Sequence, residues 1–159
     1  MTSSFLLACR TLAAALSLSL GAAESLSALG GSGSPAAYAA RALVAEKKWP
    51  AAIDELDKVN QRDSAEWNNL MGYAQRKKAP PDLAAAERYY DAALRIDPQH
   101  RGALEYSGAL YLMTDKLAKA EERLASLDKA CLFSCEEYRD LKRAVERYKA
   151  AGNKYVPDP

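Results

Sequence analysis

The sequence contains little of what several functional classes depend on. Its 159 residues include one histidine, three cysteines and two phenylalanines, and aromatic residues make up only 8% of the chain. The 22 lysines and arginines nearly cancel the 21 aspartates and glutamates, which argues against a strongly basic nucleic-acid binder and against an acidic disordered tail. Eight glycines and seven prolines are too few for an extended disordered chain. A mean hydropathy of -0.32 excludes a polytopic membrane protein.

The single histidine leaves little room for catalytic or metal chemistry. Metal sites need several histidine or cysteine ligands, so His100 cannot form one alone, and we expect an ordinary loop histidine. No nucleophile motif of the G-x-S-x-G kind occurs, and the glycine-rich stretch 30–33 has no strand before it and no lysine after it. We therefore predict that the protein is not an enzyme. We also predict no cofactor, no metal site, no small-molecule substrate and no nucleic-acid partner.

Residues 1–23 have the pattern of a secretory signal peptide. Arg10 precedes an apolar run that is shorter than the roughly 20 residues needed to cross a bilayer, and small residues at Gly21 and Ala23 suit a cleavage site. The alternatives are a buried N-terminal helix and a membrane anchor. We predict export with cleavage before Glu24, which leaves no membrane span in the mature chain. Residues 24–35 are Gly/Ser-rich and are expected to be a flexible lead-in.

The composition past residue 35 favours helix throughout. Alanine, leucine, glutamate, lysine and arginine dominate, and runs of β-branched residues are almost absent. Breakers divide the chain into expected helices at 36–47, 51–60, 64–78, 82–96, 101–114, 117–130 and 135–150. The short connections favour three antiparallel pairs near 36–60, 64–98 and 101–130. Helix 135–150 is then a C-terminal cap, its apolar stripe running from Tyr138 to Tyr148, and 151–159 is a tail.

Glycines recur at equivalent places in the second and third pairs. Gly108 precedes Ala120 by twelve residues, and Gly72 precedes Ala86 by fourteen, the difference being accommodated in a Pro-containing connection. We interpret Gly108 and Ala120 as facing each other where the two helices of a pair cross closely.

This pattern resembles the tetratricopeptide (TPR) family, whose helix–turn–helix repeat has about 34 residues. The resemblance is carried by 67–98 and 101–127. The segments NNLMGYAQRK, RIDPQHRGALEYSGALYL and CLFSCEEYRDLKRAVERY are similar to small exported TPR proteins of Gram-negative bacteria. The resemblance implies an all-α fold, an antiparallel helix-pair array or TPR-like α-solenoid, of about 2.5–3 repeats plus the capping helix. It also implies a periplasmic location and a protein or peptide partner.

Repeat arrays of this kind bind partners through the face formed mostly by the first helix of each pair. Aligning Gly72 with Gly108 maps the candidate partner-binding residues: Arg41, Glu66, Asn69, Tyr73, Arg76, Lys77, Glu105 and Leu112. This mixed surface suits an extended peptide or a partner helix. Glu105 argues against the clamp with which some family members grip a peptide's C-terminal carboxylate. The implied function is a non-catalytic adaptor or scaffold in the bacterial cell envelope.

Two cysteines remain after signal removal, Cys131 and Cys135. In one continuous helix their Cβ atoms would lie about 5–6 Å apart, and a disulfide needs about 3.5–4.5 Å, so a bond requires a helix break. Ser134 as N-cap and Glu137 three positions later would form a capping box that begins a new helix. We predict a structural disulfide. Free thiols remain an alternative, as does a redox or copper-handling accessory protein that uses both thiolates.

Overall fold

The computed structural model describes the backbone of residues 35–157 and the side chains from residue 38 onward. Seven helices and no strand occur in this range. They are α1 (Pro35–Ala45), α2 (Trp49–Val59), α3 (Ala65–Lys77), α4 (Leu83–Ile96), α5 (Arg101–Met113), α6 (Leu117–Ala130) and α7 (Glu136–Ala150). The predicted signal peptide and cleavage site, and the lead-in up to residue 34, lie outside the described residues.

The predicted all-helical fold is confirmed for the described residues, and each expected helix is found within a few residues of its predicted bounds. Local signals explain where the helices begin. Ser64 caps α3, where its Oγ accepts a hydrogen bond from the Trp67 N–H at 3.2 Å. α2 begins at Trp49 rather than at residue 51, since Pro50 in the first turn lacks only an N–H that a helix start leaves unpaired.

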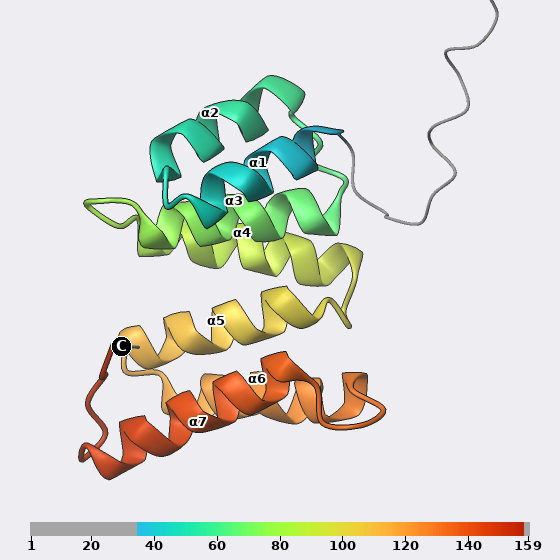
Figure 1. The fold of residues 1–159 in the computed structure, drawn as a ribbon. Coiled ribbons are helices and arrows are strands. Elements are labelled where there is room, and N and C mark those ends of the chain that lie inside the picture. The colour runs from blue at the N-terminus through green and yellow to red at the C-terminus, as the bar shows by residue number, and fades with distance from the viewer. Residues whose placement is uncertain (1–34, 158–159) are drawn as a thin grey trace, which may run out of the picture. The chain divides into compact units, whose positions relative to one another are not determined.

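Helices that follow each other along the chain pack together, and so do successive odd-numbered helices. α1 packs on α2, α3 on α4 and α5 on α6, and the odd-numbered helices also contact one another as α1–α3, α3–α5 and α5–α7 (Figure 1). Among the described elements, the backbones of α2, α4 and α6 do not approach one another, and α4 meets α6 only through side chains, in the ion pairs Lys119–Glu87 and Arg123–Asp91. The four odd-numbered helices, α1, α3, α5 and α7, therefore lie next to one another in this order although they are separated along the chain. No described helix is long and apolar enough to cross a membrane.

The core consists of two clusters of buried side chains. The smaller one joins α1, α2 and α3 around Trp67, whose indole N–H donates to the Leu56 carbonyl oxygen at 2.8 Å. The larger one spans α4 to α7. α7 contributes Leu141, Val145 and Tyr148 to it, which confirms the apolar stripe expected of this helix. Burying the large Trp67 side chain is stabilising because its one polar atom keeps a partner.

The predicted close crossing of Gly108 and Ala120 is wrong. A Cβ atom at Gly108 would lie 2.5 Å from Cδ2 of Leu141, which comes from α7 rather than α6. A Cβ atom at Gly72 would likewise lie 2.8 Å from the ring of Tyr90 on α4. Each of these glycines thus leaves room for one large side chain of a neighbouring helix. Because the core is closely packed, a residue with a side chain at either position would clash with that neighbour.

The predicted disulfide is present between Cys131 and Cys135, whose Cα atoms are 5.7 Å apart. The required helix break is there as well, because α6 ends at Ala130 and α7 begins at Glu136. The predicted capping box is wrong: Cys135 is the N-cap residue, and no side chain caps this helix end. The disulfide holds Cys135 at the entrance of α7, so the exposed Ser134 lies one residue too early to cap it.

Candidate functional site

The predicted partner-binding residues lie on α1, α3 and α5, but they do not form one exposed surface. Arg41 and Lys77 are exposed, and Glu66, Tyr73 and Glu105 are half-buried.

Three further members are almost fully covered. Asn69 is 5% exposed, Arg76 is 7% exposed and Leu112 is 1% exposed. Leu112 belongs to the larger core cluster, so the prediction that it contacts a partner is wrong. The physical reason is that α5 packs against α3, α4, α6 and α7, which leaves little of its surface open. Asn69 and Arg76 lie beneath the surface that they were expected to form.

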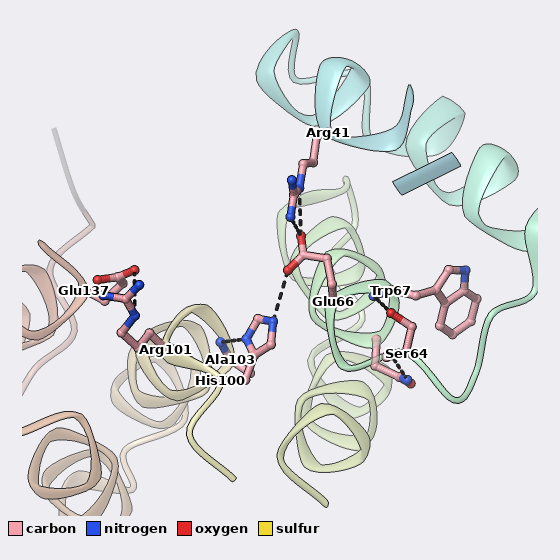
Figure 2. A network of polar contacts seen from close by, with 9 residues as sticks. Arg41, Ser64, Glu66, Trp67, His100, Arg101, Ala103 and Glu137 are labelled. Carbon is pink, nitrogen blue, oxygen red and sulfur yellow. Dashed lines mark hydrogen bonds and ion pairs between the residues drawn. The ribbon is translucent and has the colours of Figure 1, made fainter. Parts of the chain in front are cut away.

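Glu66 is the centre of a polar network that joins three segments of the chain (Figure 2). Arg41 of α1 binds it through Nε at 2.9 Å and through Nη2 at 2.8 Å. His100 approaches the other carboxylate oxygen, with 3.0 Å between Nε2 and Oε2. Desolvation raises the pKa of Glu66, but the hydrogen bonds and charges of His100 and Arg41 outweigh it and the pKa is lowered overall. Glu66 is therefore ionised at neutral pH.

His100 is not the ordinary loop histidine that the sequence suggested. Its Nδ1 accepts a hydrogen bond from the Ala103 N–H at 3.1 Å, so the imidazole caps the N-terminus of α5. A neutral ring with its proton on Nε2 satisfies both contacts, because Nε2 donates to Glu66 while Nδ1 accepts from the helix. His100 thereby links α3 to the start of α5. The sequence signal for this role was its position immediately before the first residue of that helix.

A row of aromatic rings crosses α2, α3, α5 and α4. The ring centroids of Trp49 and Tyr73 are 5.8 Å apart, those of Tyr73 and Tyr106 are 4.5 Å apart, and those of Tyr106 and Tyr90 are 6.4 Å apart. The guanidinium carbon of Arg76 lies 5.4 Å from the Tyr73 centroid and 5.6 Å from that of Tyr106. Arg76 therefore holds these rings by cation–π contacts instead of reaching outward.

Glu105 lines two cavities, of ≈ 340 Å³ and ≈ 430 Å³. Only the larger of these two is also lined by Tyr106 of the aromatic row. We refer to the larger space as the odd-helix cavity. Its lining residues are Arg41, Glu66, Asn69, Asp97, Gln99, His100, Arg101, Gly102, Glu105, Tyr106 and Glu137. The structure thus brings Arg41, Glu66, Asn69 and Glu105 together at one site. It does not bring Tyr73, Arg76, Lys77 or Leu112 into the lining.

The sequence-based mapping missed several lining residues because they come from helix starts. Arg101 stands at the beginning of α5, and its Nε is 3.8 Å from Oε1 of Glu137 in the first turn of α7 (Figure 2). The only available signal was the N-terminal position of these residues in their helices. Which helix starts meet is decided by packing, and residue spacing does not contain that information.

Two side chains in the odd-helix cavity, Asn69 and Glu105, have a polar group that no other described protein group contacts. Oδ1 of Asn69 is buried and accepts no hydrogen bond. Within the described residues, no hydrogen bond or ion pair reaches the Glu105 carboxyl group. Burial is the main reason that the pKa of Glu105 rises to about 8, and the Asp140 carboxylate raises it further. Arg76 opposes this rise, and Glu105 therefore carries a proton for most of the time at pH 7.

Known proteins do not identify this chain. No family model matches it, and neither a curated protein nor a solved structure matches it. The resemblance to TPR repeats therefore rests on the sequence pattern alone, and function has to be argued from the site.

The chemistry that the described residues offer is recognition by charge and hydrogen bonding. No three histidine, cysteine or acidic side chains in the described part of the chain are placed to hold a metal ion. Cys131 and Cys135 are joined to each other, so in this oxidised form neither sulfur is a free thiolate. The odd-helix cavity instead presents one buried amide and one unpaired carboxyl group to whatever enters it.

Proposed function

We propose that this protein is a non-catalytic interaction module that binds a protein or peptide partner in the odd-helix cavity. The observation that carries the proposal is the cavity itself, which is bordered by residues of α1, α3, α5 and α7 and has one buried amide oxygen without a partner, that of Asn69, in its lining. Polar groups that lose water without gaining a hydrogen bond are unfavourable, and a ligand that supplies the missing bonds gains from them.

The packing of the helices supports a TPR-like array. Such arrays stack helix pairs so that the first helices of successive pairs lie next to one another and form the binding face. Here the backbones of the odd-numbered helices approach one another in chain order, whereas those of the even-numbered helices in the described range do not, and α4 meets α6 only through side-chain ion pairs. We propose that α1–α2, α3–α4 and α5–α6 are the repeats and that α7 is the cap.

The nature of the lining supports a polypeptide ligand. The cavity falls within the roughly 300–1,000 Å³ of typical ligand sites, but those are mostly apolar, whereas charged and amide side chains dominate this one. The half-buried rings of Trp49 and Tyr73 lie beyond its edge and add contact area of the kind that interfaces favour. A peptide segment that enters the cavity and continues over these rings fits both features.

We further propose that the mature protein acts in the periplasm as an adaptor or scaffold. This part rests on the signal-peptide pattern of residues 1–23. The alternative of copper handling requires free thiolates at Cys131 and Cys135, which the disulfide between them does not offer, whereas a redox role would use this same bond as its oxidised form.

Site-specific photocrosslinking in intact cells tests the proposal. A photoreactive amino acid replaces Arg41 or Arg101, which are exposed and line the cavity. The matched control replaces Glu122, an exposed residue of α6 that does not line it. We expect the same protein to be crosslinked from both cavity positions and not from position 122. Crosslinks that form only from position 122 would show that the partner binds elsewhere.

A further inference from the structure

The odd-helix cavity contains one carboxyl group that lacks the partner its neighbours have. Glu66 is paired with Arg41 and His100. Asp97 accepts a hydrogen bond from the Gln99 N–H at 3.0 Å.

The nearby carboxylates of α7 also have partners. Glu137 faces Arg101, and Asp140 is bound by Arg143. Glu105 has no such contact among the described residues. A half-buried carboxylate without an ion-pair contact is unfavourable, and because burial outweighs the charge of Arg76, the pKa of Glu105 is raised to about 8 and the free protein retains a proton there.

The charges around Glu105 come mainly from α3 and α7. The ionisable groups that face it or share its cavities are Arg41, Glu66, Tyr73, Arg76, Asp97, His100, Arg101, Tyr106, Glu136, Glu137, Asp140, Arg143 and Arg147. The arginines nearest the cavity are already engaged: Arg41 by Glu66, Arg101 by Glu137 and Arg143 by Asp140. Arg76 acts on Glu105 through its charge but forms no ion pair or hydrogen bond with it among the described residues, so the carboxyl group is open to a further cation.

Asn69 supplies an independent reason to expect a ligand there. Asn69 is only 5% exposed, and no described group donates a hydrogen bond to its Oδ1. Its Nδ2 is 3.1 Å from the place where a Cβ of Gly102 would stand. Glu105 follows Gly102 by three residues on the same helix, which separates their side-chain positions by about 5–6 Å. Asn69 and Glu105 are thus close enough for one planar group to reach both.

We propose that the odd-helix cavity receives an arginine side chain of the peptide partner, whose guanidinium group donates hydrogen bonds to the Glu105 carboxylate and to Oδ1 of Asn69. A guanidinium group has five N–H donors in a rigid plane, so it can satisfy two acceptors at once. A lysine ammonium group is a point charge that pairs with Glu105 alone. The absence of a side chain at Gly102 lets the Asn69 amide group lie directly against α5, because a Cβ there would be 3.1 Å from Nδ2 of Asn69. This proposal deepens the proposed function and rests on it.

The test uses the mature chain and three synthetic peptides. The probes are acetyl-Gly-Gly-Arg-Gly-Gly-amide, the same peptide with citrulline, which has the shape of arginine without its charge, and the same peptide with lysine. Binding is followed by ¹H–¹⁵N NMR at pH 6.5 and pH 9. We expect the arginine peptide to shift the Asn69 side-chain amide and the backbone resonances of Gly102 and Glu105. It should bind at least tenfold more tightly than the citrulline peptide.

The pH dependence distinguishes Glu105 from the other carboxylates. A cation favours the ionised form, so with a pKa of about 8 the affinity should rise by roughly tenfold or more between pH 6.5 and pH 9. Glu105→Gln should remove both this rise and the preference for arginine over citrulline. The matched control Glu122→Gln, on the exposed surface of α6, should retain both.

Several results would overturn the proposal. These are equal binding of the arginine and citrulline peptides, wild-type binding by Glu105→Gln, or no shift at Asn69, Gly102 and Glu105 at millimolar peptide. Lysine binding as tight as arginine binding would refute the shared contact with Asn69. Photocrosslinks from positions 41 and 101 together with no arginine preference would reject this inference and leave the proposed function standing. Absence of those crosslinks would count against the proposed function itself.

Discussion

Leu141 of α7 fills the space that a side chain at Gly108 of α5 would occupy, and its Cδ2 would be only 2.5 Å from a Cβ at that position. Both residues are buried. The contact joins the C-terminal helix to the rest of the described helices, because α7 packs mainly on α5 and α6. A glycine in the middle of a helix costs about 0.5–1 kcal/mol relative to alanine, so its presence here is offset by the packing of Leu141.

Gly108→Ala should therefore destabilise the domain in spite of the better helix propensity of alanine. Overpacking costs about 1–3 kcal/mol, and the gain in propensity recovers only part of this. Urea unfolding measures the change. Gly102→Ala is the comparison with a milder clash, since its Cβ would lie 3.1 Å from Nδ2 of Asn69, and it should cost less than Gly108→Ala. In a Leu141→Ala background the cost of Gly108→Ala should disappear. An equal cost in both backgrounds would mean that Leu141 is not the residue responsible.

The disulfide should contribute modestly to stability. The bond closes a ring of only five residues, from Cys131 to Cys135, and the loop-entropy model gives about 2 kcal/mol for so short a ring. Cys131→Ser with Cys135→Ser should lower the melting temperature by several degrees while partner binding is retained. The exported protein should contain no free thiol. Reactive thiols in the native protein, or loss of function without loss of stability, would instead favour the redox alternative.

Glu105 should make the stability fall as the pH rises. Its pKa is about 8 in the folded protein and 4.5 when it is unperturbed, so between these values the folded state holds a proton that the unfolded state has lost. Stability therefore decreases from about pH 4.5 to pH 8. Glu105→Gln should reduce this pH-dependent loss in the free energy of unfolding by about 2 kcal/mol, a figure that allows for screening by water in the cavity. Urea unfolding at pH 5, 7 and 9 measures it, and unchanged slopes would refute the assignment.

His100 should stabilise α5 through its N-cap contact. His100→Ala removes the acceptor for the Ala103 N–H and the contact with Glu66, and should cost about 1–2 kcal/mol. His100→Asn restores a capping acceptor but does not reach Glu66, so it should recover part of the loss. The control Gln99→Ala, at an exposed neighbouring position, should have little effect in the same urea unfolding experiment. An asparagine variant no more stable than the alanine variant would argue against capping.

The pKa of Glu66 adds a second readout for the same contact. Because its pKa is lowered in the folded protein, Glu66 stabilises the fold at neutral pH, and this contribution is lost as the pH falls below the ordinary carboxyl range. His100→Ala and Arg41→Ala should each reduce this loss on the acid side. If neither variant alters the acid limb of the stability curve, the network does not set the pKa of Glu66.

Export predicts Glu24 as the first residue of the mature protein. The reason is the small-residue pattern that ends at Ala23 after a short apolar run. N-terminal sequencing of the protein from the periplasm checks this prediction. Recovery of protein that begins at Met1 from the cytosol would contradict it.

The positions of the helices were accessible from the sequence because they depend on local signals. Ser64 before α3 and the change of pattern around Cys131 each act within one turn of the chain. The burial of α7 was predictable for the same reason, since Leu141, Val145 and Tyr148 recur at helical spacing. The disulfide between Cys131 and Cys135 was predictable as well, because it depends on a local break between two helices.

The sequence by itself determined which segments are helical, since hydrophobic periodicity, capping residues and breakers are properties of neighbouring residues. Only the tertiary structure decided that Gly108 meets Leu141 rather than Ala120, that Leu112 is buried, and that Glu66 lies beside His100. It also decided that Glu105 lines the odd-helix cavity without a hydrogen bond or ion pair to another described residue. These relationships join helices that are far apart along the chain, and their geometry depends on how each helix is rotated and shifted against the next, which no local spacing specifies.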